Sequence, residues 1–306
     1  MITAVWDPDV LARVRHLHLR ARTLTDALMM GEHRSRRVGQ AVEFADYQEY
    51  VPGMDLRGLD WRVWGRTDRY VVKRFETETE LPCSIVLDLS ADLGTGTGAS
   101  GSALPDLEGS KAGYAITLAA TLLYFLHRHG EPIGLEFVAG SGMQHRSLPP
   151  RGGRNHLQAC FMNLASCRPG GRADLLPALS SVGHRVRRRS FVAVLTDGME
   201  EPGNWLPALG AFARRGADLR LIHLYDSGEW ALDFDRPSLF FSPEGGADLP
   251  VDPQGARQAF VEVAEEYERE VRSGVVRWGG RYVPVSTRRP MDAVLRQVIS
   301  GEVAWG

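Results

Sequence analysis

The segment CSIVLDLS, residues 83–90, decides how the rest of the chain is interpreted, because it is an apolar run that ends in polar side chains. The segment SFVAVLTD, residues 190–197, repeats this pattern. Such runs are typical of central strands in a parallel sheet, since helices cover both faces of that sheet. Between them, KAGYAITLAATLLYFLHRHG at 111–130 is apolar on nearly all sides and ends at a glycine. This pattern predicts a helix packed deep against the sheet.

The flanking segments continue an alternation of strands and helices. The elements predicted after residue 130 are, in chain order, a strand near an edge of the sheet at 133–140, helices at 154–167 and 173–182, a strand at 218–226, a β-like segment, a charged helix at 255–274, a strand at 280–287 and a short last helix. This order predicts an open, doubly wound α/β sheet.

The N-terminal part has a different texture. Residues 9–29 carry apolar side chains at helical spacings, which predicts an amphipathic helix closed by Gly31. Residues 39–80 mix aromatic and β-branched residues with charges, so hairpins and extended segments are expected, with a turn at 51–55. We therefore expect an N-terminal helix and β-rich region at 1–80, an α/β core at 81–230, and a C-terminal β/α region at 231–306 that packs with the N-terminal part.

Composition indicates a globular protein without a membrane span. The 306 residues are 43% hydrophobic and 24% charged, and the net charge of -2 gives no general attraction to nucleic acid or anionic lipid. The basic run HRVRRRS at 184–190 is interpreted as a solvated connector. No stretch suits a signal peptide or a spanning helix. Cys83, Cys160 and Cys167 are predicted to be buried free thiols, which favours the reducing cytoplasm.

Four oxygen-bearing side chains follow the two central strands. Asp88, Ser90 and Asp92 come directly after the first strand, and Asp197 ends the strand at 190–197. Ligands of such sheets bind beyond the carboxyl ends of the strands, at the switch in strand order. The sequence therefore predicts that these four residues lie at the correct end of the sheet for a binding site.

The stretch YVPGMDLRGLDWRVWGRTDRYVVKRFETETE at 50–80, followed by IVLDLS, resembles the bacterial family called domain of unknown function 58. The core of that family is similar to a von Willebrand factor A domain. The resemblance implies a von Willebrand A-like (Rossmann-like) doubly wound sheet with an added β-rich subdomain. It also implies a non-enzymatic protein that acts with a MoxR-type AAA+ ATPase in the assembly or activation of other proteins. Met54 stands where the family motif usually has a second aspartate before Asp55.

The resemblance also implies a magnesium site, which is degenerate here. Von Willebrand A domains hold Mg²⁺ with the pattern D-x-S-x-S, then a threonine, then an aspartate. By position Asp88, Ser90 and Asp197 match, Asp92 replaces the second serine, and Ala173 replaces the threonine. Ala173 offers no ligand, and three acids around one divalent ion would repel a partner's carboxylate. We therefore expect at most weak Mg²⁺ binding, and a loop whose oxygens mainly cap strands and helices.

Enzyme patterns are incomplete in this chain. A phosphohydrolase of the haloacid dehalogenase type needs a second carboxylate two residues after its nucleophile, where this chain has Ser90. The phosphate-binding loop G-x-x-x-x-G-K-[ST] is absent, because Lys111 follows Ser110, and no G-x-S-x-G occurs. We therefore predict that the chain is not an enzyme. The alternative is a divalent-metal-dependent hydrolase that uses Asp88, Asp92 and Asp197.

The 50–80 motif also places arginines beside aromatic residues. Trp61, Trp64 and Tyr70 are large enough to anchor a core. Four arginines share the same stretch, namely Arg57, Arg62, Arg66 and Arg69. Core packing with internal salt bridges explains them in part, but arginine beside aromatic residues is also the composition of interface hot spots. The hypothesis is that this surface, or the carboxyl end of the sheet near Asp88 and Asp197, contacts the ATPase.

Overall fold

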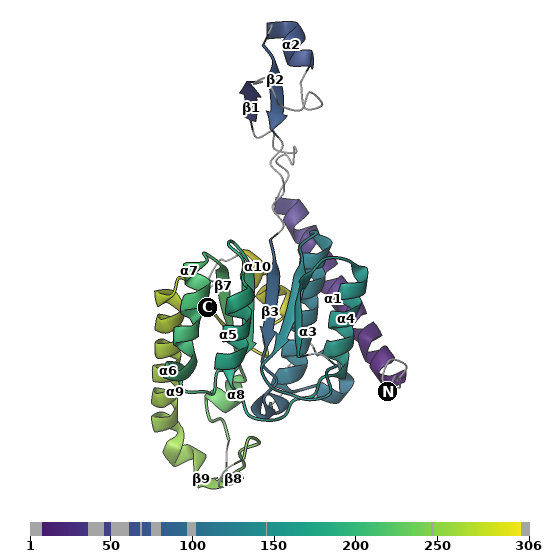
Figure 1. Cartoon of the computed structure of the whole chain (residues 1–306). Coiled ribbons are helices and arrows are strands. Elements are labelled where there is room, and N and C mark those ends of the chain that lie inside the picture. The colour runs from purple at the N-terminus through teal and green to yellow at the C-terminus, as the bar shows by residue number, and fades with distance from the viewer. Residues whose placement is uncertain are drawn as a thin grey trace. The chain divides into compact units, whose positions relative to one another are not determined.

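The computed structural model describes residues 8–35, 46–49, 61–67, 69–74, 81–96, 102–144, 146–234, 236–245 and 248–300. The chain forms two compact units, which are described separately. One unit contains residues 1–29 together with 81–306, and the other contains residues 30–80. Figure 1 shows both units and labels most of their helices and several of their strands.

The first unit is built on a six-stranded sheet with the strand order β10-β7-β6-β3-β4-β5. All neighbouring strands are parallel except β4 and β5, which pair antiparallel. In chain order the strands are β3 (Cys83–Leu87), β4 (Ile133–Phe137), β5 (Ser147–Arg151), β6 (Phe191–Thr196), β7 (Asp218–Tyr225) and β10 (Arg281–Ser286). The chain starts the sheet in the middle, at β3, and places later strands on both sides. The predicted doubly wound α/β fold is thereby confirmed.

Helices cover both faces of this sheet. One face packs against α1 (Pro8–Ser35), α3 (Lys111–Arg128), α4 (Arg154–Ser166) and α10 (Met291–Ser300). The other packs against α5 (Leu175–Arg185), the run α6–η5–α7 (Pro202–Trp205, Leu206–Leu209, Gly210–Arg214) and α9 (Pro253–Arg277). Strand β6 shows the alternation, because Ala193 and Leu195 face the first layer while Val192 and Val194 face the second.

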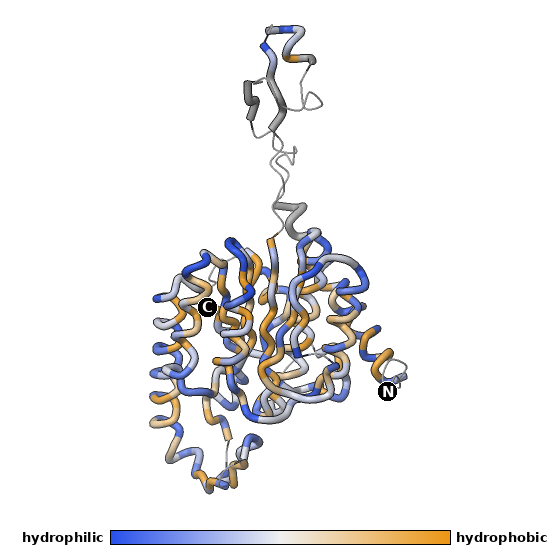
Figure 2. Tube along the Cα trace, in the orientation of Figure 1, coloured by the Kyte–Doolittle hydropathy of each residue, from blue (hydrophilic) through white to orange (hydrophobic). Residues whose placement is uncertain are grey.

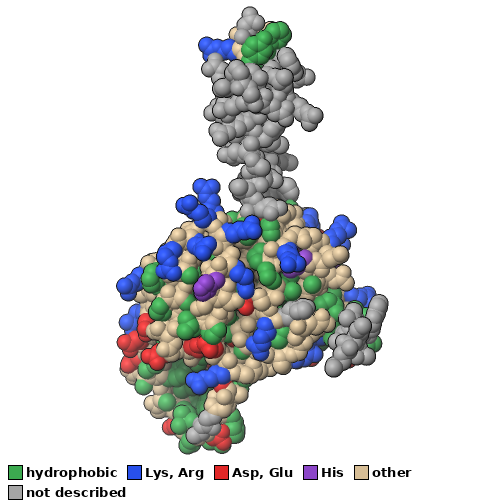
Figure 3. Space-filling model, viewed as in Figure 1, with side chains coloured by type: hydrophobic (Ala, Val, Ile, Leu, Met, Phe, Trp, Pro, Cys, Tyr) green, Lys and Arg blue, Asp and Glu red, His purple; other side chains and the backbone are tan. Residues whose placement is uncertain are grey.

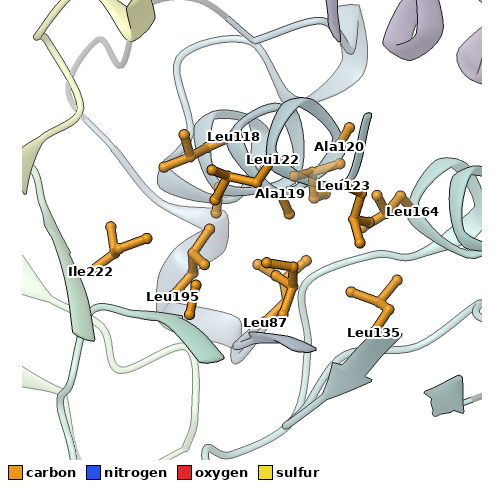
Figure 4. Packing of buried hydrophobic residues seen from close by; sticks show 14 of the residues in the cluster. Leu87, Leu118, Ala119, Ala120, Leu122, Leu123, Leu135, Leu164, Leu195 and Ile222 are labelled. Atoms are coloured by element: carbon orange, nitrogen blue, oxygen red, sulfur yellow. The ribbon is translucent and has the colours of Figure 1, made fainter. Parts of the chain in front are cut away.

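Helix α3 is the centre of the larger core. The Ser110 side chain accepts the N–H of Gly113 at 3.1 Å and so caps the first turn. The helix ends before Gly130, whose φ of +84° suits a glycine after a helix terminus. Figure 4 shows Leu118, Leu122 and Leu123 of α3 above Leu87 and Leu195 of the central strands. The sequence-based prediction of a helix buried against the sheet is confirmed.

Two details of the fold differ from the predictions. The first helix continues through Gly31 to Ser35, because one glycine inside a helix costs only about 1 kcal/mol. Strand β4 lies next to an edge of the sheet, as predicted, but the edge itself is formed by β5, a strand that was not predicted. Strand β5 was not predicted because it contains two prolines, Pro149 and Pro150, which argue against a strand. An edge strand tolerates proline because the N–H groups on its outer side need no partner in the sheet.

The second unit contains a two-stranded antiparallel sheet of β1 (Asp46–Glu49) and β2 (Val71–Arg74). The extended segments predicted here are therefore present, but helix α2 (Trp61–Thr67) was not predicted. Trp64 and Tyr70 stack with ring centroids 5.9 Å apart, and their side chains are exposed to 37% and 48%. The predicted turn at 51–55 lies outside the described residues.

The C-terminal segment adds to the first unit. Helix α8 (Ser227–Trp230) follows β7, and β8 (Ser238–Phe240) pairs antiparallel with β9 (Leu249–Val251). Strand β10 then completes the main sheet beside β7. Leu239, Phe241 and Leu249 are exposed around the β8–β9 pair.

The remaining sequence predictions concern cysteines, the basic run and membrane spans. Cys83, Cys160 and Cys167 are buried and free, as predicted. Arg187, Arg188 and Arg189 are exposed in the connector between α5 and β6. Among the helices of the described ranges, none is both long and apolar enough to cross a membrane.

The packing of α3 predicts a large cost for shortening one of its core side chains. Leu122 is 1% exposed, so Leu122→Ala should lower the free energy of unfolding by about 2–5 kcal/mol through lost burial and a residual cavity. The matched control is Leu176→Ala on α5, whose side chain is 44% exposed and whose loss should cost about 0.5 kcal/mol or less. Denaturant unfolding measures both, and equal costs would contradict this placement of α3.

Candidate functional site

Asp88 follows β3 and joins it to the end of β6. Its N–H donates to the carbonyl of Leu195 at 2.9 Å. Its carboxylate accepts the N–H of Ser90 at 2.9 Å through Oδ1 and the Thr196 hydroxyl at 2.7 Å through Oδ2. The side chain is fully buried. Both carboxylate oxygens are therefore used to hold the turn after β3 against the neighbouring strand.

Burial gives Asp88 an unusual acidity. Desolvation, together with the negative charge of the nearby Asp197, raises its pKa from the ordinary 3.8 to about 7, although the hydrogen bonds from Thr196 and Ser90 act in the opposite direction. Ser90 is also buried, with 1% of its surface exposed. Neither side chain reaches solvent, so neither can act on a substrate that stays outside the protein.

The end of β6 is held by a buried histidine. His223 has a pKa lowered to about 4 by burial, so its ring is neutral at pH 7. Nε2 lies 2.8 Å from the Asp197 carbonyl, which can only accept, so Nε2 carries the proton and Nδ1 accepts the Tyr282 hydroxyl. Gly198, with φ +68°, follows directly, and a Cβ there would lie 3.2 Å from the Tyr267 hydroxyl oxygen. This turn therefore requires glycine.

Lys111 lies among the carboxylates at the carboxyl ends of β3 and β6. Asp92, Asp197 and Glu229 form this region, which is called the acidic edge below. Its Nζ donates to Glu229 Oε2 at 2.8 Å and lies 3.3 Å from Asp197 Oδ2. The lysine side chain is 7% exposed, that of Asp197 4% and that of Glu229 31%. Lys111 is the first residue of α3, where the helix dipole disfavours a cation, so the two carboxylates supply the compensation. This ion triplet ties α3, the loop after β6 and α8 together.

Asp92 borders the same triplet. It lies half-buried in the 3₁₀ turn Ala91–Gly94. Burial and the negative charge of Asp197 raise its pKa, while Lys111 lowers it. Asp92 is thus a third carboxylate near the ammonium group that pairs with Asp197 and Glu229, and the edge as a whole carries an excess of negative charge.

The loop that contains Ala173, where the magnesium-site pattern has a threonine, lies beside the turn that follows Asp88. The N–H of Ala91 donates to the Gly171 carbonyl, and the N–H of Gly170 donates to the Leu89 carbonyl, both at 2.9 Å. Ala173, two residues farther on, is buried, and its N–H donates to Glu244 Oε1 at 3.1 Å. Its methyl group offers no oxygen to a metal ion.

These residues do not fit the magnesium site that the fold family implies. Hard divalent cations need a nearly complete shell of oxygen ligands, and Ala173 contributes none. The Lys111 ammonium already neutralises part of the acidic edge, and it would repel a second cation. Within the described ranges, no group of three or more His, Cys, Asp or Glu side chains is placed to hold a metal ion.

Sequence reasoning located only part of this site. Asp88, Ser90, Asp92 and Asp197 lie together at the carboxyl ends of β3 and β6, but Lys111 and Glu229 were missed. One signal for Lys111 was available, because it is one of two lysines in the chain and starts the helix after the first strand. Of the arginines singled out, Arg66 and Arg69 are exposed, while Arg57 and the Arg62 side chain lie outside the described part.

A pocket of about 230 Å³ opens beside the ion triplet, between α8 and α9. Lys111, Asp197 and Glu229 lie at its polar end, and its other walls are mainly apolar and aromatic. A larger hollow of about 790 Å³ lies between α1, α3 and α4, and it contains none of these charged residues. The smaller pocket is thus the one connected to the acidic edge.

Comparison with known proteins identifies the family. The family model described as "Protein of unknown function DUF58" matches residues 46–270. The chain belongs to this family. An uncharacterized protein of Mycobacterium bovis is 27% identical over 288 residues, which cover 92% of this chain and 86% of that protein.

Two solved structures are also similar to the chain. The conserved hypothetical protein BatB from Bacteroides thetaiotaomicron has a TM-score of 0.45 and 19% identity, covering 72% of this chain and 98% of that one. The VWA domain of SpRpn10 has a TM-score of 0.39 and 10% identity, covering 74% of this chain and 100% of that one. The six-stranded sheet, parallel except at β5 and covered by helices on both faces, is the doubly wound α/β fold predicted from the sequence.

The raised pKa of Asp88 predicts a dependence of stability on pH. The folded protein holds this proton more tightly than the unfolded chain, because the folded pKa of about 7 exceeds the ordinary 3.8. Asp88 therefore lowers the free energy of unfolding as the pH rises from about 4 to about 7, by up to about 4 kcal/mol. Asp88→Asn cannot titrate, so this variant should gain stability relative to wild type over that interval. Denaturant unfolding at several pH values measures the difference, and parallel profiles for the two proteins would contradict it.

A second prediction concerns the metal. Calorimetry with Mg²⁺, Mn²⁺ and Ca²⁺ should show weak or no binding to the wild type. The double variant Asp92→Ser with Ala173→Thr should gain little, because the ammonium group stays in place. Adding Lys111→Ser to that pair should raise Mg²⁺ affinity by at least roughly tenfold, since it removes a buried cation from the oxygen cluster. Micromolar Mg²⁺ binding by the wild type, abolished by Asp88→Ala, would overturn this view.

Proposed function

We propose that this chain acts by binding another protein at the carboxyl edge of its sheet, and not by catalysis. The observation that carries the proposal is the contrast between buried polar groups and exposed apolar ones at this edge. Asp88 and Ser90 are buried, whereas Met199, Phe260 and Val263 are 64%, 42% and 67% exposed. Figure 3 shows hydrophobic side chains gathered at the lower end of the molecule, over β8, β9 and the start of α9. Exposed apolar groups of this kind mark interaction surfaces.

The hydrolase alternative has less support. A metal-dependent hydrolase needs carboxylates that hold a divalent ion and an open position for substrate. Asp88 is fully buried with both oxygens hydrogen-bonded, and Asp197 faces the Lys111 ammonium. Because both Asp88 oxygens are bound within the chain, this carboxylate supplies neither a nucleophile nor a bridging ligand. The proposal therefore stays with protein binding.

Family resemblance supports a MoxR-type AAA+ ATPase as the partner, acting with this chain in the assembly or activation of other proteins. The buried free thiols support a reducing compartment, the cytoplasm, for this work. Residues 30–80 offer a second contact surface, because Arg66 and Arg69 are exposed near the stacked Trp64 and Tyr70. Arginine and aromatic side chains together are favoured at interface hot spots.

A pull-down tests the partner. The ATPase encoded nearest to the gene is expected to be captured by the wild-type chain in at least one nucleotide state, and less well by Arg66→Ala or Asp197→Ala. Arg187→Ala is the matched control for a lost exposed arginine, since Arg187 lies in the connector before β6. Thermal denaturation of each variant separates lost binding from lost folding. If the wild type captures no ATPase in any nucleotide state, the partner assignment fails.

A further inference from the structure

The pocket between α8 and α9 has the size of a single side chain. Its volume is about 230 Å³, below the roughly 300–1,000 Å³ of pockets that bury drug-sized ligands. Trp230, Phe260, Val263 and Tyr267 form most of its apolar wall. A pocket of this size and lining suits one large apolar side chain presented by a partner.

The apolar wall extends to the surface around the pocket. Phe260 and Val263 lie on the first half of α9, and Met199 lies on the loop after β6. Figure 2 shows hydrophobic and hydrophilic residues alternating along α9, and on this half the large hydrophobic side chains of Phe260 and Val263 are exposed. Single exposed apolar residues are ordinary, but several around one concavity indicate a surface that is covered in a complex.

The charged groups that line the pocket determine which kind of residue the partner can carry next to that apolar side chain. The pocket is lined by three acids, Asp197, Asp226 and Glu229, against one cation, Lys111. Glu229 is the accessible member, with 31% of its side chain exposed. Asp92 adds a further negative charge close to Lys111 and Glu229. Such an edge attracts a cationic group and repels a carboxylate.

We infer that this pocket binds a segment of a partner protein in which a large apolar side chain stands next to an arginine or lysine. The apolar side chain fills the space against Phe260 and Val263, and the cation pairs with Glu229 and Asp92. The inference rests on the proposed protein-binding function and names the chemistry of the partner. A von Willebrand A domain that uses its metal ion binds a carboxylate of the partner, whereas this pocket would bind a cation of the partner. The difference arises because Lys111 already provides the only cation among the residues that line the pocket.

Selection of displayed random peptides on the full chain tests the inference. Peptides with adjacent apolar and basic residues should be enriched, and a selected peptide should bind as well with EDTA as with Mg²⁺. Raised salt should weaken binding, since the ion pair is partly exposed. Val263→Gln and Phe260→Gln should each weaken it by at least roughly tenfold, and Glu229→Gln by several-fold. Val276→Gln is the matched control, because Val276 is 60% exposed on the same helix and outside the pocket.

Three results of the peptide selection would overturn the inference. One is enrichment of acidic peptides whose binding requires Mg²⁺, and a second is equal binding by the Val263→Gln and Val276→Gln variants. The third is the absence of any peptide that prefers the wild type to Val263→Gln. Sedimentation of the chain alone addresses a second copy as the occupant, and self-association lost in Val263→Gln would also overturn it.

The ATPase pull-down separates this inference from the proposed function. Capture of the ATPase by Val263→Gln as efficiently as by wild type would place the partner elsewhere and refute only the pocket assignment. Selected peptides without any captured ATPase would refute only the choice of partner.

Discussion

The burial of helix α3 is the constraint on which the rest of the first unit depends. This helix buries residues on all of its sides, so it needs a sheet beneath it and helices α1, α4 and α10 around it. Burying one large aliphatic side chain contributes about 1.5–3 kcal/mol, and α3 contributes several. The packing of the helix fixes the position of its first residue, Lys111, which lies at the carboxyl ends of β3 and β6.

The acidic edge follows from that placement. Lysine at the start of a buried helix is unfavourable without counter-charges, and Asp197 and Glu229 provide them. The result is a site in which the cation belongs to the chain itself. At this edge Glu229 and Asp92 are the carboxylates that stay partly exposed, whereas Asp197 is buried beside the ammonium group.

The sequence predicts the central elements well, because their signals are local. Strands β3 and β6 are continuous apolar runs, and the end of α3 is marked by Gly130. Asp88 and Asp197 could be placed at one edge because parallel strands align their carboxyl ends. The pair Lys111 and Glu229 could not, since 118 residues separate them and neither belongs to a motif. Strand β5 escaped prediction because its prolines conceal it, and the aromatic wall of the pocket depends on how α9 packs.

Helix α9 is anchored unevenly along its 25 residues, and this has a mechanical consequence. Its buried side chains are Pro253 at the start and Val271 and Val275 near the end, while Phe260 and Val263 lie in between. The span that forms the pocket wall therefore buries less apolar surface than the end of the helix, so we expect its local stability to be lower than that of the core. One side of the pocket is set by the end of β7, a strand of the core sheet, and the other by this less buried span of α9. A surface built in this way can adjust to incoming side chains of different shapes while the charged groups keep their positions.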